Sequence, residues 1–519
     1  MIYTSPFPDV PIPDVSLTEE VFRHVGRVGD RVAVIDGPTG RSYTYAQLHE
    51  AARSTAGGLV ANGLEKGEVV AILAPNIPEY AIVFHGIALS GGVVTTINPT
   101  YTIDEVAFQL RDAGARFLVT IAMFADLALA AAAASGVEAV FAIGESHDGC
   151  RSFSDLSAGD PIDQVAIDPA VDVVALPYSS GTTGLPKGVQ LTHRNLVANL
   201  IQYDSVSTAD ESDVVLAVMP FFHIYGMQVL MNGVLHIGAR VVTMPRFDLE
   251  EFLKTIETHR VTRVAVVPPI VVSLAKSPLV GRYDLSSLVQ IGSGAAPLSA
   301  DVEAEAARRT GAPVVQGFGL TETSPVTHAM SPDDPRQGSI GVPVPNTEIR
   351  VVSADGDDAP PGESGEIWIR GPQVMKGYLN QDAATRATID DDGWLHTGDI
   401  GHVDDDGFWY VTDRLKELIK VKGFQVAPAE LEAVLLTHPS VADAAVIGVA
   451  DEEAGEVPKA FVVLAEGATE THDDIAAFVA DRVAPYKRIR SVEFIEVIPK
   501  SLSGKILRRL LREGERPLG

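Results

Sequence analysis

The 519-residue chain contains one cysteine, Cys150, which excludes a disulfide framework. The surrounding residues, HDGCRSF, show no pattern typical of a nucleophilic cysteine. Basic residues are also scarce, since 40 Lys and Arg stand against 69 Asp and Glu and give a formal net charge of −29. A chain this acidic is a poor partner for nucleic acid or for an anionic membrane. Any anionic ligand must therefore be held by local donors.

Long uninterrupted hydrophobic runs are absent as well. The most apolar stretch, residues 216–242, is interrupted by Pro220, His223, Gln228 and Asn232, so we interpret it as buried core rather than a membrane span. The first residues lack the basic and apolar segments of a signal peptide, and the final RPLG matches no peroxisomal or lipidation signal. We expect a cytoplasmic protein without a membrane span.

Alternating strand and helix patterns fill the first 330 residues. "VVAILA" (69–74), the helical "PEYAIVFHGIALSG" and "VVTTI" (93–97) are an example, and such alternation is typical of βαβ units around a parallel sheet. From about Val342, strands separated by Asp-Gly and Pro-Gly turns indicate a small barrel-like region. A compact α+β pattern occupies the end of the chain. The sequence predicts an α/β plus α+β protein with an N-terminal domain (1–413) and a small C-terminal domain (414–519).

The segment YSSGTTGLPKG (178–188) concentrates small polar residues, glycines and a lysine. It is not a Walker P-loop, because Lys187 follows Pro186 and precedes Gly188. The flanking patterns predict a strand–loop–strand hairpin followed by a helix that Thr192 caps. Hydroxyls and backbone N–H groups of such a loop bind phosphate oxygens, and Lys187 adds a positive charge. The loop residues concerned are Ser179, Ser180, Gly181, Thr182, Thr183 and Gly184.

Further motifs follow in order: QGFGLTET (316–323), WLHTGDIG (394–401), VTDRLKELIKVKGFQVAPAELE (from 411) and PKSLSGKILRR (499–509). Together with the phosphate loop they resemble the adenylate-forming superfamily of acyl-CoA synthetases, luciferases and peptide-synthetase adenylation domains. The resemblance implies that ATP and Mg²⁺ convert a carboxylic acid to an acyl-adenylate with release of pyrophosphate. It also implies that the C-terminal domain is mobile and swings about a hinge near Lys416 before the second step.

The resemblance assigns the nucleotide and catalytic groups residue by residue. Phe318 stands where the family usually has tyrosine, which keeps an aromatic face but loses a hydroxyl. Without the resemblance, Lys505 would be one cation of a basic tail. The implied set is Gln316, Gly317 and Phe318 along the nucleotide, Thr321 at the α-phosphate, Glu322 at Mg²⁺, Asp399 and Arg414 at the ribose, and Lys505 at the carboxylate and α-phosphate.

Coenzyme A is the thiol acceptor that the resemblance implies. Lys422 and Gly423 match residues that contact it, while Lys420 and Gln425 match residues near the adenylate phosphate and the acyl carbonyl. Arg246 matches a basic position at the CoA nucleotide phosphate, although its segment is equally typical of a loop before a helix. The expected cosubstrates and metal are therefore ATP, coenzyme A and Mg²⁺.

Over nearly the whole chain the sequence is similar to bacterial 4-coumarate or cinnamate:CoA ligases, which favours a hydroxycinnamate substrate. His223 would orient the carboxylate, and small residues would leave a flat slot for an aromatic ring. Three positions depart from the plant enzymes, namely Gln228, Gly292 and Thr327. A pocket opened at Gly292 would instead take an acyl chain. The implied acyl pocket is Ile224, Tyr225, Gly294, Ala295, Gly317, Gly319, Pro325 and Val326.

Several alternatives stay open on the sequence alone. A medium- or long-chain fatty acyl-CoA synthetase shares the motif INPTYT (97–102). A luciferase-like oxygenase shares every motif. A non-catalytic adenylate-binding protein would be expected to lack Lys505 or Glu322, and both are present. The expected oligomeric state is a monomer or homodimer, and the metabolism is either that of phenylpropanoids or that of fatty acids.

Overall fold

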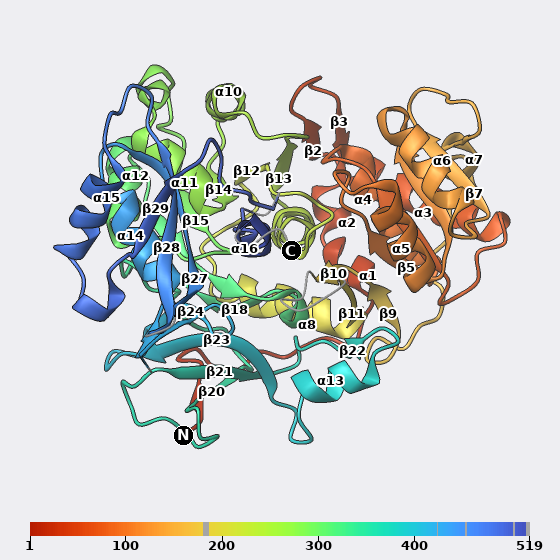
Figure 1. The fold of residues 1–519 in the computed structure, drawn as a ribbon. Helices are drawn as coiled ribbons and strands as arrows, with labels where there is room; N and C mark the ends of the chain where they lie inside the picture. Colours follow the sequence, from red (N-terminus) through yellow and green to blue (C-terminus); the bar gives the residue numbers. More distant parts are fainter. Residues whose placement is uncertain (180–185, 423, 452–453, 502–503, 515–519) are drawn as a thin grey trace.

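The computed structural model describes residues 1–179, 186–422, 424–451, 454–501 and 504–514 (Figure 1). A nine-stranded sheet has the order β10-β11-β9-β5-β4-β6-β7-β8, with β22 paired to β11. Its centre is parallel, as the βαβ alternation predicts, and the strands around the phosphate loop are antiparallel. Its strands are β4 (Val69–Leu73), β5 (Val93–Thr96), β6 (Ala115–Ile121), β7 (Ala139–Ile143), β8 (Arg151–Ser152), β9 (Val173–Ala175), β10 (Tyr178–Ser179), β11 (Lys187–Thr192) and β22 (Gly377–Tyr378).

A second large sheet has seven strands in the order β16-β15-β14-β12-β13-β2-β3. All its pairs are parallel except the β2–β3 hairpin at one edge. Its strands are β2 (Val32–Asp36), β3 (Ser42–Thr44), β12 (Val214–Ala217), β13 (Arg240–Thr243), β14 (Arg263–Val266), β15 (Gln290–Ser293) and β16 (Val314–Gln316).

Helices cover these two sheets, and one hydrophobic core runs through both. Helix α4 is buried on every side, which explains why its sequence is apolar all round. Thr192 caps α8 as predicted, because its hydroxyl accepts from the backbone N–H of Asn195. The helices are α1 (Leu17–Val21), α2 (Val25–Val28), α3 (Tyr45–Ala61), α4 (Pro78–Leu89), α5 (Ile103–Ala113), α6 (Ala125–Ala133), α7 (Ser154–Ser157), α8 (His193–Asp204), α9 (Val234–His236), α10 (Leu249–His259), α11 (Pro268–Lys276), α12 (Ala300–Thr310) and α13 (Asp382–Thr388), with the short 3₁₀ helices η1 (Ala122–Phe124), η3 (Pro278–Arg282) and η4 (Thr321–Thr323) and the π-helical segment η2 (Tyr225–Gly233).

Two antiparallel sheets form the barrel-like region expected from the turn-rich sequence. An isolated bridge between Gly341 and Trp409 links them, and the buried ring of Trp409 packs in their shared core. The five-stranded sheet contains β1 (Tyr3–Thr4), β20 (Glu348–Val352), β21 (Gly365–Arg370), β23 (Leu395–Val403) and β24 (Trp409–Arg414); the three-stranded sheet contains β17 (Phe318–Gly319), β18 (Val326–Ala329) and β19 (Val342–Pro343).

The last hundred residues form an α+β unit with its own core, seen in blue in Figure 1. This confirms the predicted fold class. Strand β24 ends at Arg414 and the first strand of the new sheet begins at Ile419, so the predicted division at 413/414 and hinge at Lys416 fall at this change of sheet. The elements are β25 (Ile419–Val421), β26 (Phe424–Val426), α14 (Pro428–Leu436), β27 (Val441–Asp451), β28 (Gly455–Leu464), α15 (His472–Ala480), η5 (Pro485–Lys487), β29 (Ser491–Phe494) and α16 (Arg508–Gly514).

No described helix is both long enough and apolar enough to cross a bilayer. The apolar stretch around Pro220 and Gln228 instead contributes to β12 and η2 and is largely buried.

Candidate active site

The phosphate-loop segment begins and ends on paired strands. Tyr178 and Ser179 of β10 pair with Gly188 and Lys187 of β11, which is the predicted hairpin. The hydroxyl of Tyr178 donates to Asp112 at 2.7 Å and fixes the first strand. The predicted residues Ser180, Gly181, Thr182, Thr183 and Gly184 lie outside the described residues.

Lys187 and Glu322 are brought together by Tyr378, which the sequence reasoning did not single out. The Lys187 ammonium lies 4.7 Å from the centre of the Tyr378 ring, and the Tyr378 hydroxyl donates to Glu322 Oε1 at 2.9 Å. Tyr378 reaches both because β22 pairs with β11. Glu322 is buried, so Tyr378 orients a carboxylate that has little contact with bulk water.

Asp399 and Arg414 face each other across the β23–β24 hairpin. They are register partners, and Arg414 Nε lies 3.0 Å from Asp399 Oδ1. The second carboxylate oxygen, Oδ2, is buried and has no hydrogen-bond partner within the described structure. Burial raises the pKa of Asp399, an effect that Arg414 and Lys505 oppose. The buried free oxygen is an acceptor suited to a ligand hydroxyl.

Lys505 approaches this cluster from the C-terminal unit. Burial and, to a smaller extent, the charge of Arg414 lower the pKa of its ammonium to about 8, against the opposing effect of the Asp399 and Glu322 carboxylates. Lys505 lies on a tight turn in which Ser501 N–H donates to the Lys505 carbonyl at 2.8 Å. The structure therefore joins the last motif of the chain to three earlier ones.

Two contacts hold the Lys505 turn in place. Gly504 has a φ of +78°, and a Cβ built on it would lie 2.9 Å from Val267 Cγ2 at the start of α11. Arg508, three residues after Lys505, is anchored inside the C-terminal unit, where its guanidinium donates to both carboxylate oxygens of Glu432 on α14 at 2.7 and 2.8 Å.

His223 and Tyr225 border the same region. The Tyr225 backbone N–H donates to His223 Nδ1 at 3.3 Å, so Nε2 carries the hydrogen of the neutral ring. Burial and, to a smaller extent, the charge of Lys505 lower the pKa of His223 to about 4. The imidazole is therefore a neutral donor near pH 7.

Of the predicted acyl residues, Gly294 and Gly317 lie beside Tyr225. A Cβ on Gly294 would lie 3.5 Å from the Tyr225 hydroxyl and 3.6 Å from the Gly317 carbonyl, so these three line one space. Gly319 instead passes directly against the backbone of Pro325, so its lack of a side chain allows two chain segments to cross. Ala295 is exposed at a φ of +70°, whereas Ile224 and Pro325 are buried. Val326 begins β18 nearby.

Some side chains of the QGFGLTET segment border the candidate site, and others point into the protein interior. The Gln316 amide is buried, donating to Glu303 at 2.8 Å and to the Leu298 carbonyl at 3.1 Å, so its side chain supports the loop from behind. The Phe318 ring is half-buried beside His328, and Thr321 begins η4. Thr327 is fully buried and donates to the Phe318 carbonyl at 3.2 Å.

The residues predicted for CoA (Arg246 and Lys422), for the adenylate phosphate and acyl carbonyl (Lys420 and Gln425) and for the hinge (Lys416) lie elsewhere. Lys420 and Gln425 are register partners on the β25–β26 hairpin, and both are exposed, as is Lys422 at a φ of +50°. Arg246 is exposed just before α10, and Lys416 is exposed between the two sheets. Gly423, also predicted for CoA, lies outside the described residues. In this arrangement Lys505 is close enough to Asp399 and Glu322 for their charges to affect its pKa.

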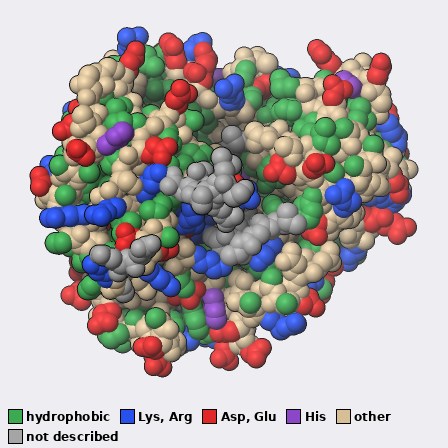
Figure 2. Space-filling model, viewed as in Figure 1, with side chains coloured by type: hydrophobic (Ala, Val, Ile, Leu, Met, Phe, Trp, Pro, Cys, Tyr) green, Lys and Arg blue, Asp and Glu red, His purple; other side chains and the backbone are tan. Residues whose placement is uncertain are grey.

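Charge is unevenly distributed on the face shown in Figure 2. Lys and Arg side chains border the central hollow, whereas Asp and Glu lie mainly toward the periphery. The acidic chain thus provides local positive charge where anions are expected. Among the residues the structure describes, no group of three or more His, Cys, Asp or Glu side chains forms a metal cage. A single carboxylate such as Glu322 is nevertheless the donor set that Mg²⁺ uses when phosphate oxygens complete its shell.

These features define an AMP-binding enzyme, and comparison with known families agrees. The family model "AMP-binding enzyme" matches residues 21–379, and the model "AMP-binding enzyme C-terminal domain" matches residues 430–505. The chain belongs to this family.

Individual relatives indicate which AMP-binding enzymes the chain is most usefully compared with. The chain is 47% identical over 524 residues to 4-coumarate–CoA ligase 3 of Oryza sativa subsp. japonica, covering 99% of this chain and 94% of the relative. It is 44% identical over 526 residues to 4-coumarate–CoA ligase 2 of Petroselinum crispum, with coverages of 99% and 96%. Among solved structures, it is similar to the anthranilate CoA ligase AuaEII in complex with anthranoyl-AMP, at 29% identity and a TM-score of 0.91, covering 97% and 98% of the two chains. It is also similar to ATP-bound MatB from Rhodopseudomonas palustris, at 30% identity and a TM-score of 0.88, covering 97% and 99%.

Proposed function

We propose that this chain is an ATP-dependent acid–thiol ligase that converts a hydroxycinnamate-type acid first to its acyl-adenylate and then to its CoA thioester. The observation that carries the proposal is the convergence of Lys505 with Asp399, Glu322 and His223, groups that come from four separate parts of the sequence. The likeness to plant 4-coumarate–CoA ligases over the whole chain supports the same conclusion.

The first step brings together two anions, the acid and the α-phosphate, and the residues present suit that task. The Lys505 ammonium neutralises charge that builds up as the carboxylate oxygen attacks phosphorus and pyrophosphate leaves. The His223 N–H orients the carboxylate, and Thr321 offers a hydroxyl at the α-phosphate. Fixing both reactants in one orientation supplies much of the remaining acceleration.

The nucleotide is assigned to the Asp399–Arg414 pair and the phosphate hairpin. The buried free Oδ2 of Asp399 would accept from a ribose hydroxyl, and Arg414 would hold the carboxylate in that pose. Lys187 faces the departing phosphates. Glu322, oriented by Tyr378, would hold Mg²⁺, which supplies charge neutralisation at the phosphates.

Thioester formation requires a different face of the C-terminal unit. We assign this step to the exposed hairpin carrying Lys420, Lys422 and Gln425, with rotation at Lys416. Arg246 is assigned to the CoA nucleotide. The separate hydrophobic core of the unit supports movement as a rigid body. The cytoplasmic location and the oligomeric state stay predictions from the sequence.

The test follows both half-reactions with cinnamate, 4-coumarate, benzoate, octanoate and palmitate. Pyrophosphate release that depends on an aromatic propenoic acid, together with a CoA thioester seen by mass spectrometry, supports the proposal. Adenylation that never proceeds to a thioester would contradict the ligase assignment. Turnover with the fatty acids alone would contradict the hydroxycinnamate assignment. Lys505→Ala should lower adenylation far more than thioester formation from supplied acyl-adenylate.

A further inference from the structure

One face of strand β15 leads away from the proposed acyl site toward the N-terminal end of the strand. Alternate residues of a strand share a face, so Gln290 and Gly292 lie on the same side, and Gly294 follows beside Tyr225. On the neighbouring strand β14, Arg263 pairs with Gln290 and Ala265 pairs with Gly292. These positions form a continuous surface that runs about 13 Å from Gly294 to Gln290, at about 3.3 Å per residue.

A cavity with a volume of about 80 Å³ lies over this surface. It shares Gln228, Gly292 and Val326 with the acyl pocket and its neighbours, and it continues past Gly292 to Gln290 and Arg263. Its apolar walls come mainly from α8, η2, α9 and β12, and include Leu200, Val215, Val229, Leu230, Val234 and Ile237.

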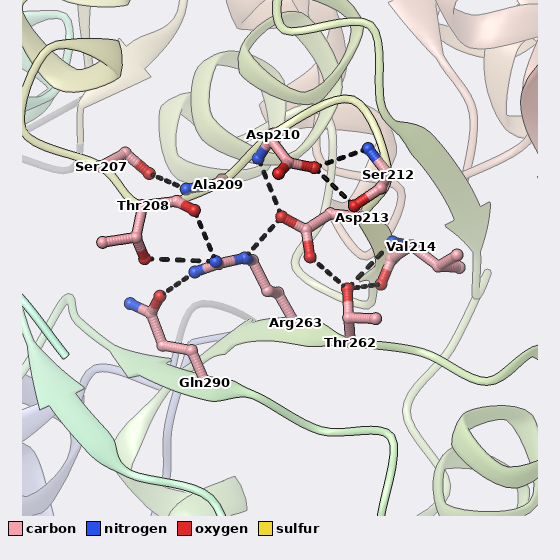
Figure 3. A network of polar contacts seen from close by, with 10 residues as sticks. All are labelled: Ser207, Thr208, Ala209, Asp210, Ser212, Asp213, Val214, Thr262, Arg263 and Gln290. Atoms are coloured by element: carbon pink, nitrogen blue, oxygen red, sulfur yellow. Dashed lines mark hydrogen bonds and ion pairs between the residues drawn. The ribbon is translucent and has the colours of Figure 1, made fainter. Parts of the chain in front are cut away.

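Several polar side chains in its wall are engaged with other protein groups. Figure 3 shows the network at the end far from Gly294, where the Arg263 guanidinium donates to Asp213, Gln290 and the Thr208 carbonyl. Nearer Gly292, the Gln228 amide donates to the Leu196 carbonyl at 2.8 Å and accepts from Asn232 at 3.1 Å.

Both polar atoms of the Asn199 amide bond the backbone of Val326. His236 is the exception, because its ring nitrogens lie 3.4 Å from Glu20 and 3.5 Å from Asp204 and neither has a hydrogen-bond partner among the described residues. A ligand that enters this cavity would therefore find mainly apolar contact, which favours an apolar occupant.

Gly292 stands at the connection between the acyl pocket and this cavity. A Cβ built there meets nothing closer than 3.7 Å, so glycine is not required by the fold at this position. A larger side chain would instead project along the cavity wall beside Ala265. The absence of a side chain keeps the passage open.

We infer that the preferred acid carries an apolar tail that passes Gly292 into this cavity, so that its far end reaches beyond the 4-position of a cinnamate ring. The inference rests on the proposed ligase function. Two kinds of acid combine a carboxylate with an extended apolar end, namely a 4-alkoxycinnamate and a straight-chain fatty acid. Each buried methylene should raise kcat/KM about three- to fourfold until the cavity is filled.

The experiment compares kcat/KM for two series of acids. One series is cinnamate and its 4-methoxy, 4-propoxy and 4-pentyloxy derivatives, and the other is butanoate, octanoate and dodecanoate. Gly292→Leu fills the passage, and Gly292→Ala is a smaller step that the available space accommodates. Gly281→Leu is the matched control, because Gly281 is exposed and a built Cβ meets nothing within 4 Å.

We expect kcat/KM to rise along at least one series in the wild type. Gly292→Leu should lower the ratio of long-tail to short-acid activity at least tenfold, Gly292→Ala should lower it less, and Gly281→Leu should leave it unchanged. The series that shows this pattern identifies the kind of tail.

Two outcomes overturn the inference: activity that falls with every added carbon in both series, or a Gly292→Leu variant that lowers short and long acids equally. A lack of thioester with any acid would instead refute the proposed function. In that case the rise in melting temperature that each acid produces with ATP and Mg²⁺ decides the inference separately. Stabilisation that grows with tail length and is lost in Gly292→Leu supports it, and stabilisation independent of the tail refutes it.

Discussion

Gly504 offers a way to separate the two half-reactions without touching a catalytic group. It immediately precedes Lys505 and has a φ of +78°, and its Cα faces Val267 at the start of α11. In Gly504→Ala, the left-handed backbone costs about 1–2 kcal/mol wherever the C-terminal unit lies. The new methyl group would also lie 2.9 Å from Val267 Cγ2 and 3.0 Å from its Cβ.

The steric cost of the contact with Val267 applies only in the orientation of the C-terminal unit that the structure describes. Overpacking of this kind costs about 1–3 kcal/mol, which corresponds to a loss of about 5- to 150-fold in the population that carries out adenylation. Thioester formation from supplied acyl-adenylate should change less than about twofold, because the contact with α11 is not needed once the unit has rotated.

The assay is ATP–pyrophosphate exchange for the first step and thioester formation from synthetic acyl-adenylate for the second. The double variant Gly504→Ala/Val267→Gly removes both Val267 contacts of the new methyl group and should restore exchange activity at least about threefold relative to Gly504→Ala. Equal losses in both half-reactions, or no recovery in the double variant, would refute the assignment of the Gly504–Val267 contact to the adenylation step.

Three further predictions concern the nucleotide end. Asp399→Ala should raise the KM for ATP about 10- to 150-fold, since it removes a buried charge-assisted acceptor and leaves Arg414 unpaired; an unchanged KM would remove the ribose assignment. Adenylation should fall as the pH rises through about 8, because Lys505 then loses its ammonium charge, and a rate that stays flat to pH 9 would contradict this role. Tyr378→Phe should raise the Mg²⁺ concentration for half-maximal activity about 10- to 100-fold by releasing Glu322, which a magnesium titration of pyrophosphate release measures; an unchanged requirement would separate Tyr378 from the metal site.

Much of the fold was predictable because its signals are local. Apolar β-branched runs alternate with helical segments around β4, α4 and β5, and those elements form close to the expected ranges. The cap at Thr192 and the hairpin that flanks the phosphate loop also depend on neighbouring residues. The C-terminal unit was recognisable for the same reason.

The site was predictable as a set of motifs but not as a set of contacts. Tyr378 contacts Glu322 across 56 positions, a separation that local spacing does not encode. The glycines near the acyl pocket look alike in sequence, yet Gly319 permits a backbone crossing while Gly292 opens a cavity. Gln316 belongs to a nucleotide motif, but its amide is used inside the protein. Distinguishing such roles requires knowing what lies opposite each residue.

The Arg508–Glu432 pair extends the region on which the reaction rate depends. Lys505 is three residues from an arginine fixed to α14, so the reach of its ammonium depends on an ion pair that never meets ATP. A substitution at Glu432 would therefore register in a functional screen as a kinetic defect, although the residue lies 73 positions before the lysine that it affects. Sequence variation at such supporting positions can tune turnover in related enzymes while every residue that touches substrate stays the same.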